Sequence, residues 1–335
     1  MNTKSQVLRL LEAQRGSYIS GSELARRLQV SRNSVWKAVH ELQKDGYVIC
    51  GKTNCGYCLG EENDLVSAEG ILPYLRSSAK MIRIQGYKSV DSTNNVAKKI
   101  ALDGMFENQV ILAETQTSGR GRNGRQFYSP RGSGLYLSFL LRSELKPEQA
   151  ILVTSAAALA VTQSIEKFIT DEKIQIKWVN DLFLNGKKIC GILTEASSNW
   201  ESGRIDHIIL GIGINVSEGP DGFPKELQGI AGAIYKRGEA PLLRNRLAAE
   251  VISQVLEMMN ALEQNDAMAH SVIEEVRRRS LVLGNAVDIQ GFGKLKRGLA
   301  IDLDERGFLV VEDAEGKRHT LSSGEISLQV KKHEN

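Results

Sequence analysis

The first 60 residues constrain the fold most strongly. Apolar side chains recur at helical spacing in three segments, at residues 7–11, 24–28 and 35–42. Ser20 and Glu23 form a capping box before the second segment, and Ser31 can cap the third, which Gly46 ends. Residues 47–60 can then form two short strands. Three helices followed by a hairpin predict a winged helix-turn-helix.

The charge of this segment indicates a polyanionic partner. Residues 1–60 carry nine Lys and Arg against four Asp and Glu, a net charge of +5, whereas the whole chain carries only +3. The outer side of the third helix and the wing offer side chains that bind phosphates and base edges: Ser31, Arg32, Asn33, Ser34, Lys37 and Lys52. We expect DNA binding here. A small helical docking module with a basic surface is the alternative.

The cysteines raise the question of a metal or redox site. Cys55 and Cys58 form a C-x-x-C pair near Cys50, so a zinc site with His40 as fourth ligand and a redox pair both have to be weighed. The flanking glycines are typical of a hairpin rather than of the helix that follows a redox pair. We therefore expect these thiols and Cys190 to be reduced and packed as small apolar groups.

The composition is that of an ordinary globular chain. Of its 335 residues, 41% are hydrophobic and 25% charged, which predicts two or three domains. The longest weakly polar run, residues 151–165, is too short and too polar to span a bilayer. The N-terminus shows neither the apolar core nor the cleavage site of a signal peptide. We expect a cytoplasmic protein without a membrane partner.

The hydrophobic pattern divides the chain into three parts. Residues 1–63 form the head, and residues 64–280 alternate strands with helices, which predicts a mixed α/β sheet. Helices are expected at residues 67–76 with a break near Pro73, and at 148–169, 242–263 and 266–280. Residues 281–335 hold five short strands between turns and predict a small SH3-like β-barrel, either a capping domain or a nucleic-acid binder. The expected fold class is α/β (α+β).

A glycine- and arginine-rich segment follows an expected strand. Three glycines match G-x-G-x-x-G and alternate with three arginines: Gly119, Arg120, Gly121, Arg122, Gly124 and Arg125. The apolar helix that completes a dinucleotide-binding motif does not follow. Guanidinium groups on a glycine-rich backbone suit phosphate or carboxylate, because each can form two charge-assisted hydrogen bonds. We expect an anion-binding loop, with a plain basic hairpin as the alternative.

Further polar residues stand next to apolar strands. Asn180 and Asp181 lie at a tight turn in KWVND, where an amide and a carboxylate can hold a metal or an amine. Lys188 enters an apolar strand, which indicates a paired or functional lysine. Gly211 and Gly213 leave room for a flat ring to approach the backbone.

Taken together, these motifs resemble the biotin protein ligase family, and the winged head resembles its bifunctional form, which also represses the biotin operon. The motifs occur in order along nearly the whole chain: DSTN at 91–94, ETQTSGRGRNGR at 114–125, SP at 129–130, GLYLS at 134–138, KWVND at 177–181, GKKICGIL at 186–193, GIGINV at 211–216 and GEISL at 324–328.

The resemblance implies an activity and its partners. Such a ligase forms biotinyl-5′-AMP from biotin and ATP with Mg²⁺, and then transfers biotin to one lysine of a biotin carboxyl carrier protein, such as that of acetyl-CoA carboxylase. Biotinyl-5′-AMP would also act as the corepressor of a homodimer that binds operator DNA.

The resemblance also assigns residues to the site. Biotin would be bound by Ser92, Thr93, Asn94, Gln116, Arg120, Gly121, Arg122 and Lys188. The adenylate would be bound by Gly119, Arg125, Phe127 and Asn215. Lys188 and Arg122 would meet the biotin carboxylate and the α-phosphate, and Asp181 would assist the incoming lysine or the metal. No side chain is assigned as a dedicated metal ligand.

Two positions depart from the family pattern. Val179 stands where the family usually has proline, and Phe127 stands where it often has tryptophan. Neither change removes a charge, so we expect activity. The alternatives are a repressor that only senses a ligand and a lipoate-type ligase, which generally lacks the winged head and the GRGRNGR run.

Overall fold

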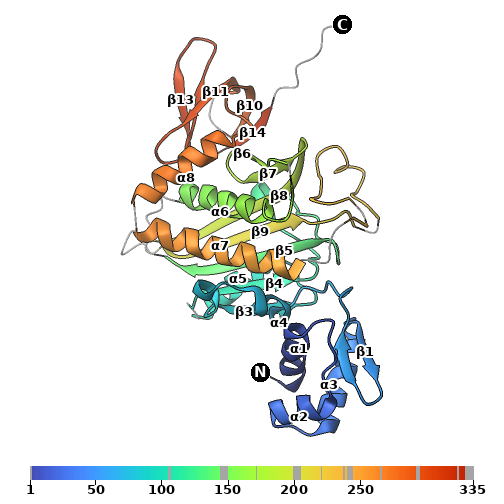
Figure 1. Cartoon of the computed structure of the whole chain (residues 1–335). Coiled ribbons are helices and arrows are strands. Elements are labelled where there is room, and N and C mark those ends of the chain that lie inside the picture. The colour runs from blue at the N-terminus through green and yellow to red at the C-terminus, as the bar shows by residue number, and fades with distance from the viewer. Residues whose placement is uncertain are drawn as a thin grey trace.

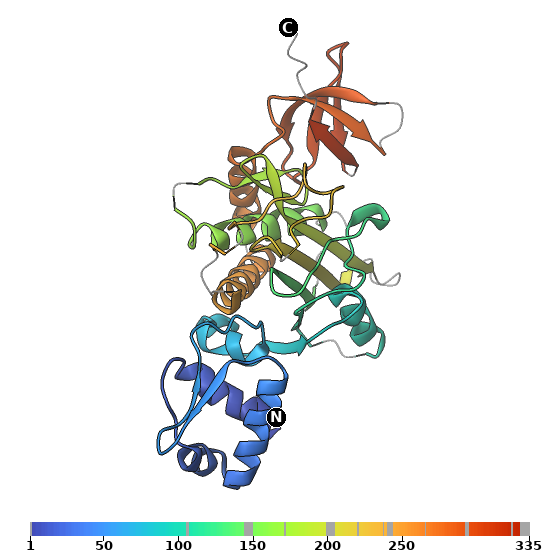
Figure 2. The same ribbon diagram turned by 90° about the vertical axis from the view of Figure 1, so that its right-hand side faces the viewer.

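The computed structural model describes most of the chain. The described residues are 2–104, 107–143, 150–170, 172–198, 205–219, 221–236, 238–239, 244–264, 266–291, 295–322 and 324–328. They form three parts that follow one another along the molecule, with the N-terminal head at one end and the C-terminal strands at the other (Figures 1 and 2).

The head is the predicted winged helix-turn-helix. It consists of α1 (Thr3–Ala13), α2 (Gly21–Leu28) and α3 (Arg32–Lys44), followed by the hairpin of β1 (Ile49–Lys52) and β2 (Gly56–Leu59). Ser20 and Ser31 cap α2 and α3 by accepting hydrogen bonds from backbone amides three residues on, as expected. Gly56 has a positive φ, and a Cβ here would lie 2.1 Å from the Ile19 carbonyl oxygen. Only glycine therefore fits where the wing crosses the segment before α2.

A short connection joins the head to the body. The helix expected at residues 67–76 is only one turn, α4 (Ala68–Ile71), followed by 3-10 turns at Leu72–Tyr74 and Ser77–Ala79. Pro73 has no amide hydrogen to continue the helical ladder, which explains why the helix is shorter. The connection is fastened by Arg244, whose side chain is 3% exposed and bonds both the carboxylate and the backbone carbonyl of Asp64.

The body is built on a seven-stranded mixed sheet, which confirms the predicted class. Its strand order is β3-β4-β5-β9-β8-β7-β6, and only the β3–β4 pair is parallel. The strands are β3 (Arg83–Tyr87), β4 (Gln109–Ala113), β5 (Gly134–Arg142), β6 (Gln175–Lys177), β7 (Asp181–Leu184), β8 (Lys187–Ser198) and β9 (Ile205–Asn215).

Helices cover the two faces of this sheet differently. The long helices α6 (Ala150–Ile165) and α7 (Arg244–Gln264) cross one face (Figure 1), and α8 (Asp266–Arg278) packs beside them. Alternate strand residues such as Phe139 and Leu210 belong to the core under these helices, whereas Leu140 and Ile209 pack against α5 (Thr93–Leu102). The face that α5 shares is therefore only partly covered, and it remains open for a site.

The C-terminal part contains the five predicted strands. They are β10 (Ala286–Gln290), β11 (Arg297–Leu303), β12 (Leu309–Glu312), β13 (Arg318–Leu321) and β14 (Glu325–Leu328), in the antiparallel order β13-β12-β11-β10-β14. Closure of these strands into an SH3-like barrel stays a prediction. The indole nitrogen of Trp178 donates to the Gly307 carbonyl oxygen at 2.9 Å, which ties this part to the body. Within the described ranges, no helix combines the length and apolar character needed to cross a bilayer.

Candidate active site

A pocket of about 600 Å³ opens on the α5 face of the sheet. Its wall combines α5, the glycine-arginine loop (residues 118–127), strands β7 to β9 and residues 324–326 from the C-terminal part. Nearly all residues expected at the biotin, nucleotide and catalytic sites line it: Ser92, Thr93, Asn94, Gln116, Arg120, Gly121, Arg122, Arg125, Phe127, Asp181, Lys188 and Asn215. The exception is Gly119, which packs directly behind the wall, where a Cβ would lie 2.4 Å from the Phe127 carbonyl oxygen.

Glycines make the floor of the pocket flat. A Cβ on Gly213 would lie 2.5 Å from the Phe127 ring, and one on Gly211 would lie 2.1 Å from Asn94 Oδ1. The expected flat ring over this strand is therefore one of the protein's own, that of Phe127. This ring meets Tyr136 edge to face at 6.4 Å.

Buried polar side chains form one end of the floor. The backbone amide and hydroxyl of Thr93 both donate to Gln116 Oε1, at 2.9 and 3.1 Å, and Gln116 Nε2 donates to Ser129 Oγ at 2.8 Å. Ser138 Oγ lies 2.6 Å from Asn94 Oδ1. Ser138 and Ser129 were not among the predicted residues, although both belong to the motifs GLYLS and SP. These groups suit a small ligand head that both donates and accepts hydrogen bonds.

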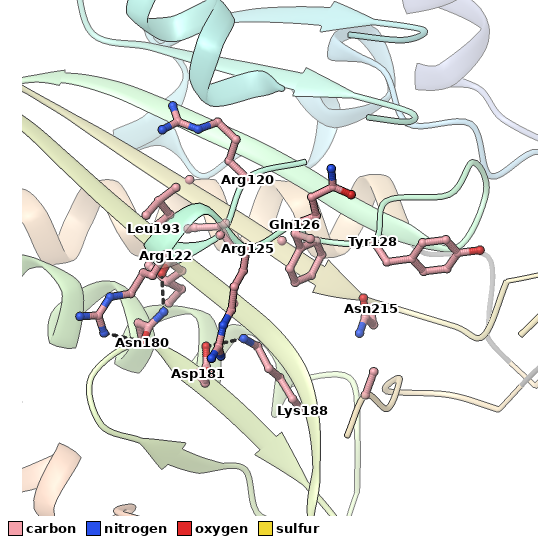
Figure 3. Close-up of a pocket in the computed structure, with 18 of the residues that line it drawn as sticks. Arg120, Arg122, Arg125, Gln126, Tyr128, Asn180, Asp181, Lys188, Leu193 and Asn215 are labelled. Carbon is pink, nitrogen blue, oxygen red and sulfur yellow. Dashed lines mark hydrogen bonds and ion pairs between the residues drawn. The ribbon is translucent and has the colours of Figure 1, made fainter. Parts of the chain in front are cut away.

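The three loop arginines have different partners. Arg120 bonds Glu195 at 3.1 Å and Asn95 at 3.0 Å, and Arg125 bonds Glu325 at 2.5 Å. Among the described residues, Arg122 donates to neutral groups alone, Asn180 Oδ1 at 3.2 Å and the Gly324 carbonyl oxygen at 3.3 Å. In Figure 3, Arg125 points toward Asp181 and Lys188, whereas Arg120 points the opposite way. Arg122 is therefore the loop arginine whose charge is least neutralised by the protein.

Lys188 is a paired lysine, which was one of the two possibilities that the sequence indicated. Its Nζ lies 2.6 Å from Asp181 Oδ1, and both side chains are less than a third exposed. Lys177, which was not among the predicted site residues, lines the same wall. Burial lowers the pKa of Lys177; the charge of Asp181 opposes this, and the charge of Lys188 adds to it. The peptide bond between Trp178 and Val179 in this turn is cis.

The C-terminal part contributes to the pocket. Gly324, Glu325 and Ile326 line it, and the first two hold Arg122 and Arg125. No residue of this part was assigned to the site from sequence, although GEISL at 324–328 was among the motifs. The pocket is thus shared between the body and the C-terminal part, and Arg122 and Gly324, which bond each other, are 202 residues apart.

Comparison with known proteins identifies the group to which this architecture belongs. Residues 86–215 match the biotin/lipoate A/B protein ligase family, residues 3–58 an HTH domain, and residues 282–329 the biotin protein ligase C terminal domain. The chain is 30% identical to the bifunctional ligase/repressor BirA of Bacillus subtilis over 96% of this chain and 97% of that protein. The chain belongs to the biotin protein ligase family.

Other members of the family agree with this assignment. The bifunctional ligase/repressor BirA of Escherichia coli is 28% identical over 94% of each chain. The structure of the biotin protein ligase from Aquifex aeolicus in complex with biotin and ATP superposes with a TM-score of 0.60 at 28% identity, covering 74% of this chain and 98% of that one.

The expected DNA-binding residues lie on the head, far along the chain from the pocket. Arg32, Asn33 and Lys37 are exposed on α3, whereas Ser34 is half-buried and bonds the cap residue Ser31 at 2.9 Å. Lys52 is exposed at the tip of the wing. Trp36 is also half exposed on α3 and packs edge to face with His40 at 4.1 Å. Trp36 was not among the residues expected from the sequence to contact DNA, although it is exposed on the same helix.

None of the four cysteines is among the described residues that line the pocket. Cys50 and Cys58 face each other across the wing as free thiols, the first exposed and the second buried, and Cys190 lies in the main core. Burial raises the pKa of Cys58 and of Cys190. Within the described part of the chain, no three His, Cys, Asp or Glu side chains are grouped to hold a metal ion.

Proposed function

We propose that this member of the family activates biotin with ATP as biotinyl-5′-AMP and then transfers biotin to a lysine of a biotin carboxyl carrier protein. The observation that carries the proposal is the pairing of a donor-and-acceptor floor at Thr93 and Gln116 with a cationic wall at Arg122 and Lys188 in one pocket. Biotin has a head with two N–H groups and one carbonyl and a tail that ends in a carboxylate, so each end meets a matching surface.

Arg122 and Lys188 are suited to the first step. A carboxylate that attacks the α-phosphate of ATP brings two anions together, so the site has to supply positive charge. Arg122 bonds only neutral acceptors and can exchange them for an anion. Lys188 is held in place by Asp181. In this step the carboxylate oxygen forms a bond to the α-phosphorus, and pyrophosphate leaves.

The second step needs a dry site and a neutral amine. The mixed anhydride of biotin and AMP reacts with water, and the loop folded over the pocket, with Phe127 under it, shields the bond. The carrier lysine attacks the biotin carbonyl carbon, a C–N bond forms, and AMP leaves with the C–O electron pair. We assign Asp181 to accept or orient the amine proton, because its carboxylate lies at the open wall beside Lys188.

Mg²⁺ would enter this site with ATP. A magnesium ion is typically held by one or two carboxylates, several waters and the phosphates of a nucleotide. Asp181 provides one such carboxylate in the pocket. Bound there, the ion would add positive charge at the phosphates.

The head is proposed to make the protein a repressor in the cytoplasm. The exposed residues of α3 and Lys52 of the wing would contact operator DNA, and a homodimer would supply two heads for two half-sites. Biotinyl-5′-AMP would be the corepressor. We further propose domain limits of 1–63, 64–280 and 281–335.

One experiment tests the central proposal. The full chain is incubated with biotin, ATP and Mg²⁺, and the products are analysed by mass spectrometry, with lipoate as the competing substrate. We expect biotinyl-5′-AMP, and a carrier domain that gains one biotinyl group per reactive lysine. Ligand binding without any adenylate would favour the sensor alternative, and lipoyl-AMP as the main product would favour the lipoate-type alternative.

A further inference from the structure

Glu195 stands behind the polar end of the pocket, on strand β8, and it does not line the pocket itself. Its Oε1 accepts from Lys98 Nζ at 2.8 Å and from Arg120 Nη2 at 3.1 Å. Its Oε2 accepts from Asn94 Nδ2 at 3.0 Å. One carboxylate thus joins helix α5, the glycine-arginine loop and the sheet.

A charged Glu195 fixes the orientation of Asn94. A carboxylate only accepts hydrogen bonds, so the amide nitrogen of Asn94 has to face Glu195, and its oxygen Oδ1 has to face Ser138. A Cβ on Gly211 would lie 2.1 Å from the same oxygen, so the sheet leaves just enough room for this arrangement. Asn94 is 4% exposed at the edge of the pocket, so little solvent can replace its protein partners.

The orientation of Asn94 then determines whether the hydroxyl oxygen of Thr93 can accept a hydrogen bond from a ligand. Ser138 Oγ lies 2.6 Å from Asn94 Oδ1 and 2.7 Å from Thr93 Oγ1, and it has a single proton to donate. Because Asn94 Oδ1 can only accept, the proton of Ser138 is directed to it. Thr93 then gives its own proton either to Ser138 Oγ at 2.7 Å or to Gln116 Oε1 at 3.1 Å. The oxygen of Thr93 is then left with lone pairs that no protein proton occupies, facing the pocket.

We infer that Glu195 is a positioning residue for substrate specificity, which keeps Thr93 Oγ1 an acceptor for an N–H of a cyclic urea and holds Arg120 beside the same ligand head. If Asn94 turned its nitrogen toward Ser138, the hydroxyl of Ser138 would donate to Thr93 and close that acceptor. This inference rests on the proposed function, because it takes the ureido head of biotin as the group at this end of the pocket.

Glu195→Gln is the first test. A glutamine keeps the shape but presents an N–H₂ group to Lys98, Arg120 or Asn94, all of which are donors. Loss of hydrogen bonds to a charged group predicts a rise in the KM for biotin of roughly 10- to 100-fold. The KM for ATP and kcat should stay within about threefold, because the cationic wall is untouched. A biotin KM within twofold of the wild-type value would overturn the inference.

The double variant Asn94→Asp with Glu195→Gln is the second test. The new carboxylate at position 94 would accept from the new amide at position 195 and from Ser138. The hydrogen bond between positions 94 and 195 is then reversed, but Ser138 still faces an oxygen that only accepts, and the net charge is unchanged. Asn94→Asp alone places two carboxylates face to face. We expect the double variant to have a biotin KM at least roughly tenfold lower than Asn94→Asp and lower than Glu195→Gln. A double variant no better than Asn94→Asp would overturn the inference, and this comparison does not depend on how well Glu195→Gln folds.

Lys98→Met is the matched control. It removes one partner of Glu195 from the partly exposed side and leaves Asn94 and Arg120 bonded. We expect a biotin KM within about twofold of the wild-type value. A loss as large as that of Glu195→Gln would assign the effect to the salt bridge between α5 and β8 and overturn the inference. Wild-type protein that forms no biotinyl-5′-AMP would overturn the proposed function as well. Equal rates of adenylate formation in the wild type and Glu195→Gln at biotin concentrations well below the wild-type KM would overturn the inference alone.

Discussion

Lys188 and Asp181 lie on the neighbouring strands β8 and β7, with Nζ of the lysine 2.6 Å from Oδ1 of the aspartate. The pair sits in the wall of the pocket, and Figure 3 shows Arg125 pointing toward it. A pre-formed pair holds the ammonium group at a fixed place before any anion arrives, so little reorganisation is needed when charge develops. In the proposed reaction, a phosphate would recruit Lys188, and the carboxylate of Asp181 would then be released for the amine of the second step.

Lys188→Ala should therefore lose most of the adenylation activity while the fold survives. Removing one charge-assisted bond to an anionic transition state costs about 10²- to 10³-fold in rate. Single-turnover formation of biotinyl-5′-AMP measures this loss. Lys188→Arg is the control, because it keeps the charge and changes the geometry. A near-normal rate for Lys188→Ala would show that Lys188 is not the cation of the first step.

Arg122→Gly should leave adenylation possible but let the intermediate escape. Arg122 links the loop to Asn180 and to the Gly324 carbonyl oxygen, so its loss frees the loop from two sides of the pocket. Released adenylate would then acylate lysines of unrelated proteins. Free biotinyl-5′-AMP in the filtrate and biotin on a bystander protein such as albumin measure the escape. Labelling restricted to the carrier lysine, with no free adenylate, would contradict this role.

Arg244→Met should destabilise the body and loosen the connection to the head. The Arg244 guanidinium lies between Asp64 and Glu114, and burying it would disfavour its charge, but those two carboxylates raise the pKa of Arg244 above its usual value. Removing one partner of a buried ion pair leaves uncompensated charge and costs about 3–5 kcal/mol. Urea unfolding measures the change in the free energy of unfolding. Arg297→Met, at a mostly exposed pair with Asp288, should cost less than about 1 kcal/mol.

The sequence predicted the elements of the head well because they rest on local signals. Ser20 and Ser31 are caps that act within three residues, and the apolar spacing of α3 needs no information from elsewhere. The glycine-arginine loop was recognised for the same reason. Its individual partners were not, because Glu195 and Glu325 are 75 and 200 residues away from the arginines that they bind.

Contacts between segments that are distant along the chain could not be predicted from the sequence. Glu195 lies in the strand GILTEA, where a carboxylate next to apolar residues is the one local sign of a buried partner. Phe127 at the nucleotide stays a prediction. Its position on the floor of the pocket could not be predicted, because it depends on the room that Gly213, a distant residue without a side chain, leaves for the ring. The helix expected at residues 67–76 is shorter in the structure, because Pro73 interrupts it and the connection packs against α7 as 3-10 turns.

The end of α3 contacts the segments that flank the proposed biotin site. Asp45, which follows α3, forms ion pairs with Lys4 of the head and with Lys88 of the body. Lys88 is four residues before Ser92, the residue that begins the polar end of the pocket. Arg131 reaches Gly46 from the loop after Phe127, and a Cβ on Gly46 would lie 3.3 Å from its guanidinium. We expect these two contacts to couple the pocket to the head.

We expect biotinyl-5′-AMP and operator DNA to be linked ligands. A typical coupling between two sites is about 1–3 kcal/mol, or roughly 5- to 150-fold in affinity, and DNA must raise the affinity for the adenylate by the same factor. The duplex can be selected by the protein itself from a random pool, and its affinity is then measured with and without saturating adenylate. Lys88→Ala should reduce the coupling by no more than about fivefold, because its pair with Asp45 is largely exposed on the lysine side. Equal operator affinities with and without the adenylate would show that the head does not respond to the ligand of the body, even if the ligase activity stands.

Removing residues 1–60 should abolish DNA binding and leave carrier biotinylation at least partly intact, since the proposed catalytic residues all follow Asp91.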